Sequence, residues 1–367
     1  MCNRQTVLVS GTDGYQIQIG FDLLDTLGTE CTKLKLGRRA VIITDANVAP
    51  LYAEHVCGIL LHAGIDPTVL TIPAGEQSKS LSVVETCLEQ MASKQHDRNS
   101  FVIALGGGVV GDLAGTVASL YMRGLPLVQV PTTLLAQIDS SIGGKVGVNL
   151  NAGKNLAGSF YPPKLVLSDL ATLKTLPKCQ MCNGMAEAIK YGAIDDAELF
   201  TWIEKNLKSI QALDPESLTR LITRCSEIKV KLVTQDPHDK GIRASLNFGH
   251  TIGHAIENVA GYGTYSHGEA ISIGMVAAAH LSMKHTGLSP HDTASLVNLL
   301  NQTGLPVELN NSTITEQALM RAMRTDKKNS EGHINFVLLT RIGAITPPQA
   351  IPEPDIKHVL QQITHLT

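Results

Sequence analysis

The stretch Phe101-Val-Ile-Ala-Leu-Gly-Gly-Gly-Val-Val-Gly-Asp112 decides how the first half of the chain folds. Its apolar run has the composition of a buried strand and stops at three consecutive glycines. These glycines begin a G-x-G-x-x-G pattern, in which missing side chains let backbone N–H groups approach a diphosphate at the start of a helix. The stretch therefore predicts a strand, a tight turn and a helix, with a candidate phosphate site at the turn.

The glycine pattern alone leaves two interpretations open. Tight packing between a strand and a helix also requires small residues, so the glycines need not bind a ligand. The acidic residue that a dinucleotide-binding strand usually places about twenty positions later is missing, because Val130-Pro-Thr-Thr133 occupies that region. Asp45, at the end of an earlier apolar run, is the alternative candidate for holding a ribose hydroxyl.

Further short β-branched runs flank this stretch and alternate with helical segments. Residues 41–44 end at Asp45, and residues 68–72 end at a Pro-Ala-Gly turn. This alternation predicts a parallel sheet covered by helices, and the ends of such strands gather ligands in one crevice. Residues 7–9 and 15–19 flank a Gly-Thr-Asp-Gly turn and predict a β-hairpin.

The apolar period changes near Pro177. From there apolar residues recur every three and four positions, and strand-like runs nearly vanish until residues 334–339. We therefore predict an α/β domain with a Rossmann-like parallel sheet over residues 1–176, followed by a mostly α-helical domain over residues 177–367. We expect residues 334–339 to form one strand within the second domain.

Length and composition agree with a two-domain globular enzyme. The chain has 367 residues, of which 43% are hydrophobic and 17% charged, and its formal net charge is −3. These values exclude disorder as the dominant state and any global attraction to nucleic acid or to an anionic membrane. No uncharged stretch is long and apolar enough to span a bilayer, so we expect neither a nucleic-acid partner nor a membrane partner.

The seven cysteines are scattered along the chain, and its start has no apolar signal sequence. This usage predicts reduced thiols and a cytoplasmic location. Cys179 and Cys182 are the one close pair. They could supply half of a zinc site, but no second pair completes it, so ordinary buried or surface thiols are the alternative.

The region from Pro131 to Asn155 concentrates hydroxyl groups, glycines, two lysines and one carboxylate. This composition predicts a loop-rich region that suits a polar, phosphorylated ligand. A glycine-rich surface loop is the alternative, although connecting loops seldom need so many specialised residues.

Three histidines and a distant carboxylate form the candidate metal site. His250 and His254 are four residues apart and would share one face of a helix, and His267 could converge on them from the next element. Glu187 is the plausible carboxylate and lies three residues before Lys190, on the same helix face. Two histidines and a carboxylate are a familiar zinc set, although histidines at this spacing are often ordinary core or surface residues.

These motifs, taken together, resemble the 3-dehydroquinate synthase family of the sugar-phosphate cyclase superfamily. The resemblance extends over nearly the full length and is carried by ALGGGVVGDLAG, YMRG, VQVPTTLLAQIDSSIGGKVGVN, GKNLAGSFYPP, GMAEAIKYG, LNFGHTIGHAIE and SHGEA, in that order. It implies an NAD-binding α/β domain, a helical metal-binding domain and a homodimer.

The resemblance also implies which residues bind the metal ion and which bind NAD. Zinc or cobalt would be held by Glu187, His250 and His267. NAD would be bound by Asp45, Gly75, Glu76, Lys79, Gly108, Val109, Val110, Gly111, Asp112, Thr132, Thr133, Lys145, Lys154, Thr172, Leu173, Lys174 and Thr175.

The substrate residues implied in the same way are Asp139, Lys145, Asn155, Lys190, Lys229, Arg243, Asn247, His254 and Lys327, with Arg123 reaching the neighbouring subunit's site. The planar guanidinium of Arg243, helped by Lys229, suits the substrate carboxylate; Lys145, Lys327, His254, Asn155 and Arg123 suit the phosphate. One catalytic acid is usually Glu in relatives, and the matching residue here is Asp239, whose shorter side chain puts that role in question.

The implied reaction converts 3-deoxy-D-arabino-heptulosonate 7-phosphate, a phosphorylated sugar acid, to 3-dehydroquinate and phosphate in the shikimate pathway of aromatic amino-acid biosynthesis. It proceeds by transient oxidation with NAD, phosphate elimination, re-reduction and intramolecular aldol closure. The alternatives are a cyclase for another sugar phosphate, a metal-dependent polyol dehydrogenase and a non-catalytic nucleotide-binding module. Lys229, Asn247 and His254 favour dehydroquinate among the cyclases, because they match the site for the anionic heptulosonate.

Overall fold

The computed structural model describes residues 4–11, 14–237, 239, 241–261, 263–311, 313–324 and 333–364. The chain divides into two compact units. The first unit comprises Met1–Pro177 and Leu213–Thr234, and the second comprises Lys178–Ala212 and Gln235–Thr367. Each unit is described by itself.

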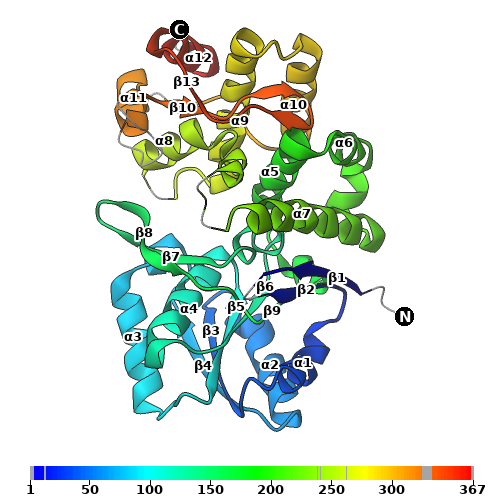
Figure 1. Cartoon of the computed structure of the whole chain (residues 1–367), viewed down its shortest axis with the longest axis vertical. Coiled ribbons are helices and arrows are strands. Elements are labelled where there is room, and N and C mark those ends of the chain that lie inside the picture. Colours follow the sequence, from blue (N-terminus) through cyan, green and yellow to red (C-terminus); the bar gives the residue numbers. More distant parts are fainter. Residues whose placement is uncertain are drawn as a thin grey trace. The chain divides into compact units, whose positions relative to one another are not determined.

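A seven-stranded sheet forms the centre of the first unit (Figure 1). Its strands lie in the order β1 (Gln5–Val9), β2 (Tyr15–Gly20), β9 (Leu165–Asp169), β6 (Leu127–Pro131), β5 (Ser100–Gly106), β3 (Arg39–Asp45) and β4 (Asp66–Ile72). Every neighbouring pair is parallel except β1 and β2, which form the predicted antiparallel hairpin.

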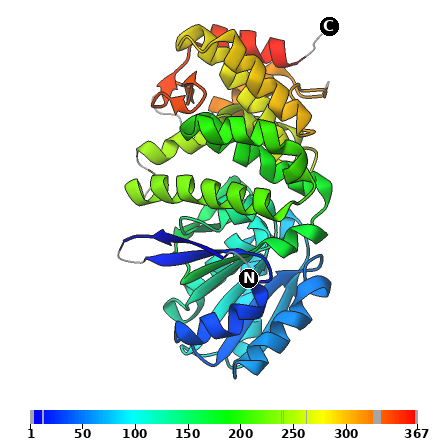
Figure 2. The ribbon, with the colours of Figure 1, turned by 90° about the vertical axis from the view of Figure 1, so that its right-hand side faces the viewer.

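Helices cover both faces of this sheet, because its central strands are apolar on both sides. Val41 and Ile43 of β3 pack with α3 (Leu81–Ser93) and α4 (Gly108–Leu120). Their neighbours Ala40 and Ile42 face α1 (Leu27–Lys33) and α2 (Ala49–His62). Continuous apolar runs are typical of parallel strands buried on both faces. Figure 2 shows the layers of this unit edge-on.

The chain order of the strands creates a switch point beside β3. β4 follows β3 on one side, and β5 returns to its other side. Helices leave the sheet in opposite directions at such a point and open a crevice at the carboxyl ends of the strands. The three turns after β3, β4 and β5 therefore lie at one edge of the sheet, as the sequence predicts.

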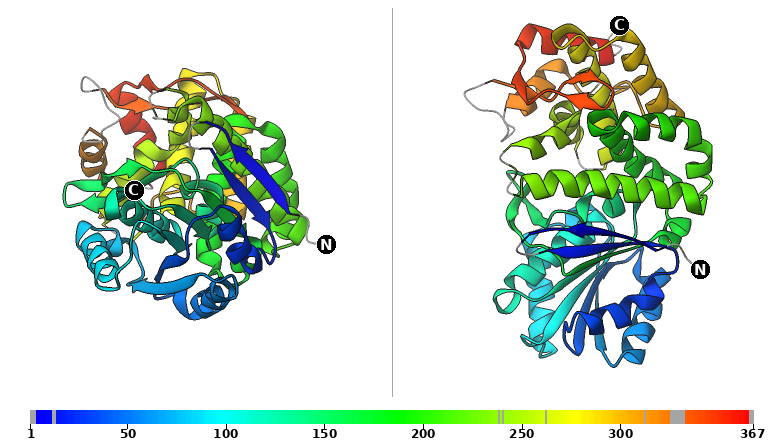
Figure 3. Two further views of the ribbon diagram at one scale, coloured as in Figure 1. Left: turned by 60° about the horizontal axis from the view of Figure 1, so that its bottom comes forward. Right: turned by 45° about the vertical axis from the view of Figure 1, so that its right-hand side comes forward.

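The region from Pro131 to Asn155 is more regular than expected, so the loop-rich prediction is wrong there. It contains a short π-helix, η4 (Ala136–Ser140), and most of a hairpin between β7 (Lys145–Leu150) and β8 (Gly153–Phe160). Figure 1 labels both strands of this hairpin, and Figure 3 shows the first unit from two further sides. The hairpin's glycines permit close strand approach: a Cβ at Gly147 would lie 2.9 Å from the carbonyl oxygen of Ala157. Gly147 and Gly158 are therefore packing residues within strands rather than markers of a loop.

The second unit is mostly helical. Its helices are α5 (Lys178–Asp195), α6 (Ala197–Gln211), α8 (His250–Ala260), α9 (His267–His285), α10 (Pro290–Gln302), α11 (Glu316–Arg324) and α12 (Glu353–Ile363). α9 is buried along nearly its whole length and packs against α5, α8, α10 and α12. The predicted fold class, a parallel-sheet α/β part and a helical part, is confirmed. The long helix α7 (Pro215–Gln235) belongs almost entirely to the first unit.

The single strand predicted over residues 334–339 is wrong. β10 (Asn335–Phe336) pairs with β13 (Gln349–Ala350), whereas β11 (Leu339–Arg341) pairs with β12 (Ala344–Ile345). Val337 and Leu338 between them are buried. An apolar run indicates burial, but it does not reveal that its two ends pair with different partners.

None of the described helices has the length and apolar character needed to cross a membrane.

Glu30 on α1 provides a test of stability in the first unit. Its carboxylate accepts hydrogen bonds from Gln18 (3.0 Å), Lys33 (2.9 Å) and Arg4 (3.3 Å). Burial alone would raise the pKa of Glu30, but these bonds lower it to about 2.

The lowered pKa means that Glu30 stabilises the folded state fully above pH 4.5 and loses that effect as the pH falls towards 2. After allowance for solvent screening, we expect a contribution of roughly 1–2 kcal/mol. Glu30→Gln should flatten the fall in unfolding free energy between these pH values, measured by urea denaturation. An unchanged pH profile would contradict the assignment.

Candidate active site

The predicted NAD-binding residues of the first unit follow five adjacent parallel strands. Asp45 is the last residue of β3, and the others lie after β4 (Gly75, Glu76 and Lys79), β5 (Gly108, Val109, Val110, Gly111 and Asp112), β6 (Thr132 and Thr133) and β9 (Thr172, Leu173, Lys174 and Thr175). Because carboxyl ends of parallel strands share one edge, the structure brings these segments to that edge.

The glycines after β5 open the helix α4, and they also pack tightly. A Cβ at Gly111 would lie 2.9 Å from Oε1 of Gln129, and one at Gly108 would lie 3.0 Å from Oγ of Ser140. The glycines therefore lie at a helix start and also pack closely against their neighbours, while phosphate binding there stays a prediction. Asp45 Oδ1 accepts hydrogen bonds from the backbone N–H groups of Asn47 (2.8 Å) and Val48 (3.0 Å).

A buried ion pair joins the turn after β4 to the helix after β5. Lys79 is 6% exposed and pairs with Asp112 in the second turn of α4. Burial raises the pKa of Asp112, and Lys79 acts against that shift. Glu76 accepts a hydrogen bond of 2.7 Å from Asn149 on β7. These contacts fix two of the predicted cofactor segments to each other.

Two residues without a predicted role organise the turn after β9. Asp169 accepts hydrogen bonds from the backbone N–H groups of Asp22 (3.0 Å), Leu24 (2.9 Å) and Ala171 (2.9 Å). The buried Gln137 donates to Thr172 Oγ1 at 3.2 Å and to carbonyl oxygens at the ends of β6 and β9. Gln137 lies two residues before Asp139 in a motif that carries the family resemblance, but its burial cannot be read from that motif.

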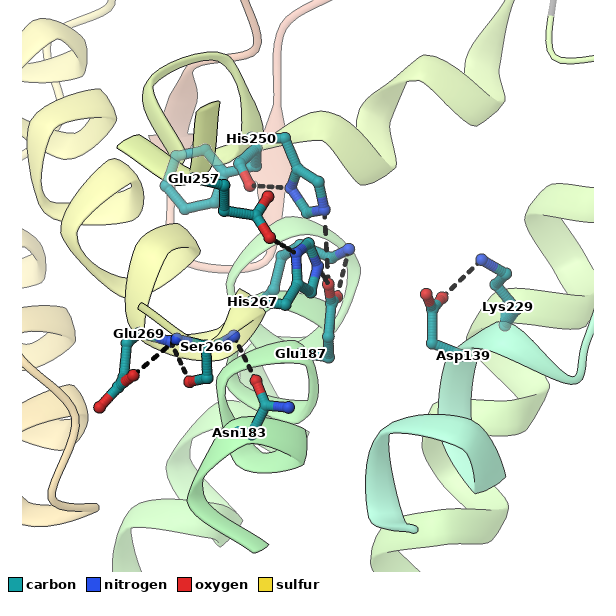
Figure 4. Close-up of polar contacts among 12 residues, drawn as sticks. Asp139, Asn183, Glu187, Lys229, His250, Glu257, Ser266, His267 and Glu269 are labelled. Atoms are coloured by element: carbon teal, nitrogen blue, oxygen red, sulfur yellow. Dashed lines mark hydrogen bonds and ion pairs between the residues drawn. The ribbon is translucent and has the colours of Figure 1, made fainter. Parts of the chain in front are cut away.

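Asp139 and Lys229 form another ion pair of the first unit. Lys229 lies on α7 and is 7% exposed, and its Nζ donates to Asp139 Oδ1 at 2.5 Å. Figure 4 shows the two side chains pointing towards each other. The contact brings together residues 90 positions apart in the chain, both of which the resemblance assigns to the substrate.

The remaining predicted residues of the first unit lie on exposed or partly exposed backbone. Lys145 begins β7, and Lys154 and Asn155 lie on β8. Asn155 has a left-handed backbone (φ 53°), and its N–H donates to Asn149 Oδ1 at 2.9 Å. Arg123 also has a left-handed backbone (φ 69°), in the short 3-10 turn η3 (Tyr121–Arg123). Such conformations are strained for residues other than glycine and are enriched at functional sites.

In the second unit, two imidazole rings point towards one carboxylate. Glu187 on α5 is fully buried, and its Oε1 lies 3.4 Å from Nε2 of His250 and 3.2 Å from Nε2 of His267 (Figure 4). Candidate ligand atoms of these three residues all lie within 4.8 Å of one another. The predicted ligand set is therefore assembled from α5, α8 and α9.

The outer nitrogens of both rings face acceptors. His250 Nδ1 lies 3.1 Å from the carbonyl oxygen of Phe248, and His267 Nδ1 lies 3.5 Å from Oε1 of Glu257. An imidazole that donates through Nδ1 presents a lone pair at Nε2, which is the form that binds a metal. The two Nε2 atoms and the carboxylate thus fit a divalent cation.

The buried charges of this group shift the pKa values of both histidines and of Glu187. Burial lowers the pKa of His250 to about 3. Burial would also lower the pKa of His267, but Glu187 and Glu257 together raise it to about 9. Lys190, which is 1% exposed, forms an ion pair with Glu187 and holds the pKa of that carboxyl well below its usual range despite burial. Glu187 and Glu257 therefore stabilise a positive charge on the His267 ring, and a cation at Nε2 would have to replace the proton there.

A second group of three shares one residue with the first. His254, Glu257 and His267 also place candidate ligand atoms within 4.8 Å of one another. The rings of His250 and His254 are 5.3 Å apart, as expected for one turn of one helix face. Glu257 stands in the histidine motif without a predicted role. Its position seven residues after His250 places it on the same face of α8.

The first turn of α9 holds His267 in place. Ser266 and Glu269 form a capping box, in which Ser266 Oγ accepts from the N–H of Glu269, and the Glu269 carboxylate accepts from the N–H of Ser266 at 2.7 Å. The side-chain oxygen of Asn183, on α5, accepts the N–H of Gly268. Asn183 thereby joins the helix of Glu187 to the helix of His267, a role that sequence reasoning missed.

The loop before η6 (Ile242–Asn247) carries further predicted substrate residues. Asp236 Oδ2 accepts from the N–H groups of Gly241 (2.6 Å) and Arg243 (3.2 Å), and the Arg243 guanidinium donates to the carbonyl of Pro237 at 3.1 Å. Asp239 has a left-handed backbone (φ 56°), which Asp adopts more readily than Glu. Asn247 ends η6, and Lys327 lies outside the described residues.

The two close cysteines lie at the start of α5. Cys179 is exposed, whereas Cys182 is partly buried and its thiol donates to the carbonyl of Thr303 at 3.2 Å. Neither occurs in a group of metal-binding residues within the part of the chain that the structure describes. This arrangement favours ordinary thiols.

Solved structures of similar fold include two synthases and an alcohol dehydrogenase. The complex of 2-deoxy-scyllo-inosose synthase with carbaglucose-6-phosphate, NAD+ and Co2+ is 27% identical, with a TM-score of 0.88, over 98% of this chain and 100% of that chain. The 2-epi-5-epi-valiolone synthase of Streptomyces hygroscopicus, with NAD+ and Zn2+ bound, is 28% identical, with a TM-score of 0.87, over 98% and 99%. An iron-containing alcohol dehydrogenase shares only the fold, at 15% identity and a TM-score of 0.69 over 99% of each chain.

Sequence comparisons cover both parts of the chain. Residues 69–183 match the family described as 3-dehydroquinate synthase N-terminal, and residues 184–329 match the family described as 3-dehydroquinate synthase C-terminal. The chain is 47% identical to the 3-dehydroquinate synthase of Desulforamulus reducens, over 96% of this chain and 98% of that protein. It is 46% identical to that of Symbiobacterium thermophilum, over 94% and 96%. With this coverage and the assembled histidine site, the chain belongs to the 3-dehydroquinate synthase family.

Proposed function

We propose that this chain converts 3-deoxy-D-arabino-heptulosonate 7-phosphate to 3-dehydroquinate and phosphate. The observation that carries the proposal is the convergence of His250 and His267 on the buried Glu187, in a chain that matches the curated synthases over nearly their full length. The reaction makes this protein a phosphate-eliminating carbon–oxygen lyase.

Two groups would supply chemistry that side chains lack. Glu187, His250 and His267 would hold a divalent cation, which would supply acidification of a bound hydroxyl, and the carboxyl edge of the sheet would hold NAD, which would supply hydride transfer. Support comes from the donor set of the second unit and from relatives solved with NAD and cobalt or zinc. We infer zinc or cobalt for this chain.

The side chains then bind and orient the substrate. The buried Arg243 suits the substrate carboxylate because its planar guanidinium can donate two parallel hydrogen bonds, and Lys229 adds positive charge. Asp139 holds the Lys229 ammonium in a fixed direction. Lys145, Asn155, His254 and Lys327 are assigned to the phosphate, and Asn247 to the sugar. Asp239 takes the place of the usual Glu, on backbone that suits the shorter residue.

Arg123 is assigned to the phosphate of a neighbouring subunit, so the proposed assembly is a homodimer. Its strained backbone supports a specialised role. A cytoplasmic location remains a prediction from the scattered cysteines.

The deciding assay supplies the heptulosonate phosphate with zinc and less NAD than enzyme. We expect many equivalents of phosphate to be released without accumulation of NADH, because NAD is regenerated in each turnover. Stoichiometric NADH without phosphate would instead identify a polyol dehydrogenase. Turnover of heptulose 7-phosphate or glucose 6-phosphate, but not of the heptulosonate, would identify a different cyclase.

Arg243→Lys tests the assignment of the carboxylate. Lysine keeps the positive charge but cannot donate two parallel hydrogen bonds to a carboxylate. We therefore expect KM for the heptulosonate to rise by about 10–100-fold, the equivalent of roughly 1.5–3 kcal/mol of binding free energy. Steady-state kinetics measure this change, and zinc content by elemental analysis serves as the control. An unchanged KM with full zinc content would exclude Arg243 from carboxylate binding.

A further inference from the structure

Glu257 is a buried carboxylate that the proposed function does not yet use. It is 7% exposed, lies in the third turn of α8 and directs Oε1 at Nδ1 of His267, 3.5 Å away. Figure 4 shows His267 lying between Glu257 on one side and Glu187 on the other. Burying a carboxylate is costly unless it has a partner, so its placement against the ring requires an explanation.

The two histidines of the metal group are arranged alike. Each presents Nε2 to Oε1 of Glu187, and each turns Nδ1 towards an acceptor outside the group. For His250 the acceptor is the backbone carbonyl of Phe248, whereas for His267 it is the side chain of Glu257. A neutral imidazole carries one N–H, and the acceptor beside one nitrogen decides which nitrogen keeps its lone pair.

We propose that Glu257 is a positioning residue that accepts the Nδ1–H of His267 and so holds its Nε2 lone pair towards a divalent cation at Glu187. The inference rests on the proposed metal site. A carboxylate in this position also makes the imidazole a stronger ligand, and the loss of such partners typically weakens metal affinity by about 10–100-fold.

The geometry favours this role over direct coordination by Glu257. Coordination by Glu257 and His267 together would most directly use Nδ1 of His267, the nitrogen that lies 3.5 Å from Oε1 of Glu257. The Nε2 atoms of His267 and His250 would then both point at Glu187 with no cation between them and the carboxylate. A cation at Glu187 satisfies both Nε2 atoms at once and leaves Glu257 to accept the remaining N–H.

The test compares three variants of the full chain. Glu257→Leu removes the acceptor at similar volume, and Glu257→Gln keeps an oxygen acceptor but removes the charge. Glu269→Gln is the matched control, because Glu269 lies in the same first turn as His267 and Gln also serves in a capping box. Zinc stoichiometry and Kd are measured in competition with a chromophoric chelator.

We expect every variant to bind one equivalent of zinc. Kd should rise about 100-fold in Glu257→Leu, about 10-fold in Glu257→Gln and not measurably in Glu269→Gln. If Glu257→Gln and Glu257→Leu both fail to bind a full equivalent at saturating zinc, Glu257 is a ligand and the proposal is wrong. If the Glu257→Leu protein is less stable to unfolding but its Kd for zinc is unchanged, Glu257 serves only in packing, and the proposal is wrong.

A spectroscopic measurement separates this inference from the metal assignment itself. In the zinc-loaded protein with 15N-labelled histidine, His267 should show a protonated Nδ1 whose hydrogen exchanges slowly with water. Glu257→Leu should speed that exchange while Nε2 stays coordinated, and unchanged exchange would contradict the proposal. Failure of the unmodified protein to bind zinc or cobalt would instead count against the proposed function.

Discussion

Glu187→Gln is expected to abolish tight metal binding and to destabilise the second unit. The amide is a weak ligand for zinc, so affinity should fall by more than about a hundredfold, and turnover by about a thousandfold or more. The same change removes the negative charge beside Lys190, which is 1% exposed. Loss of one partner of a buried ion pair costs about 3–5 kcal/mol of unfolding free energy.

The double variant Glu187→Gln/Lys190→Met separates these two effects. Removal of both charges should restore most of the stability lost in Glu187→Gln, because no uncompensated charge remains buried, whereas metal affinity should stay low. Urea denaturation of the metal-free proteins measures the first quantity, and chelator competition measures the second. Glu187→Gln with one tightly bound zinc per chain would remove Glu187 from the ligand set.

The metal group shows how far a sequence can predict a site. The spacing of His250 and His254 predicts one helix face, and the structure confirms that α8 and α9 bring His250 and His267 to Glu187. Helical periodicity alone cannot choose between His250 and His254 as the ligand, because both lie on that face. The choice depends on the direction of each ring, which is set by contacts such as His250 Nδ1 with the Phe248 carbonyl.

Glycines and apolar runs predict secondary structure less well than the histidine spacing predicts the metal group. Glycines usually mark turns and so predict a loop where β7 and β8 form a hairpin, but here they let two strands and α4 approach closely. The apolar pattern of residues 334–339 predicts one strand, although the two ends of this run pair in separate small sheets. Asn183 and Gln137 were missed because a buried polar side chain can be recognised only from its partners.

Gly274→Ala tests whether close helix packing keeps the metal ligands together. A Cβ at Gly274, in the middle of α9, would overlap the carbonyl oxygen of Gly249 and lie 2.9 Å from the nitrogen of Gly253. Gly249 caps α8 with a left-handed backbone (φ 78°) and directly precedes His250. These obstacles are backbone atoms of a buried helix start, so they cannot rotate away as a flexible side chain would.

The added methyl group must therefore push α8 away from α9 and change the distance between His250 and His267. We expect Gly274→Ala to lower the free energy of unfolding by about 3 kcal/mol and to weaken zinc binding even in the folded fraction. Gly58→Ala in α2 is the matched control, because a Cβ there meets nothing within 4 Å. It should stabilise the protein by about 0.5–1 kcal/mol, since alanine is the better helix former. Glycine-to-alanine substitution should thus lower the free energy of unfolding at Gly274 and raise it at Gly58, although both glycines lie in helices. If Gly274→Ala matched Gly58→Ala in stability and zinc affinity, glycine contact between α8 and α9 could not be what holds the metal group together.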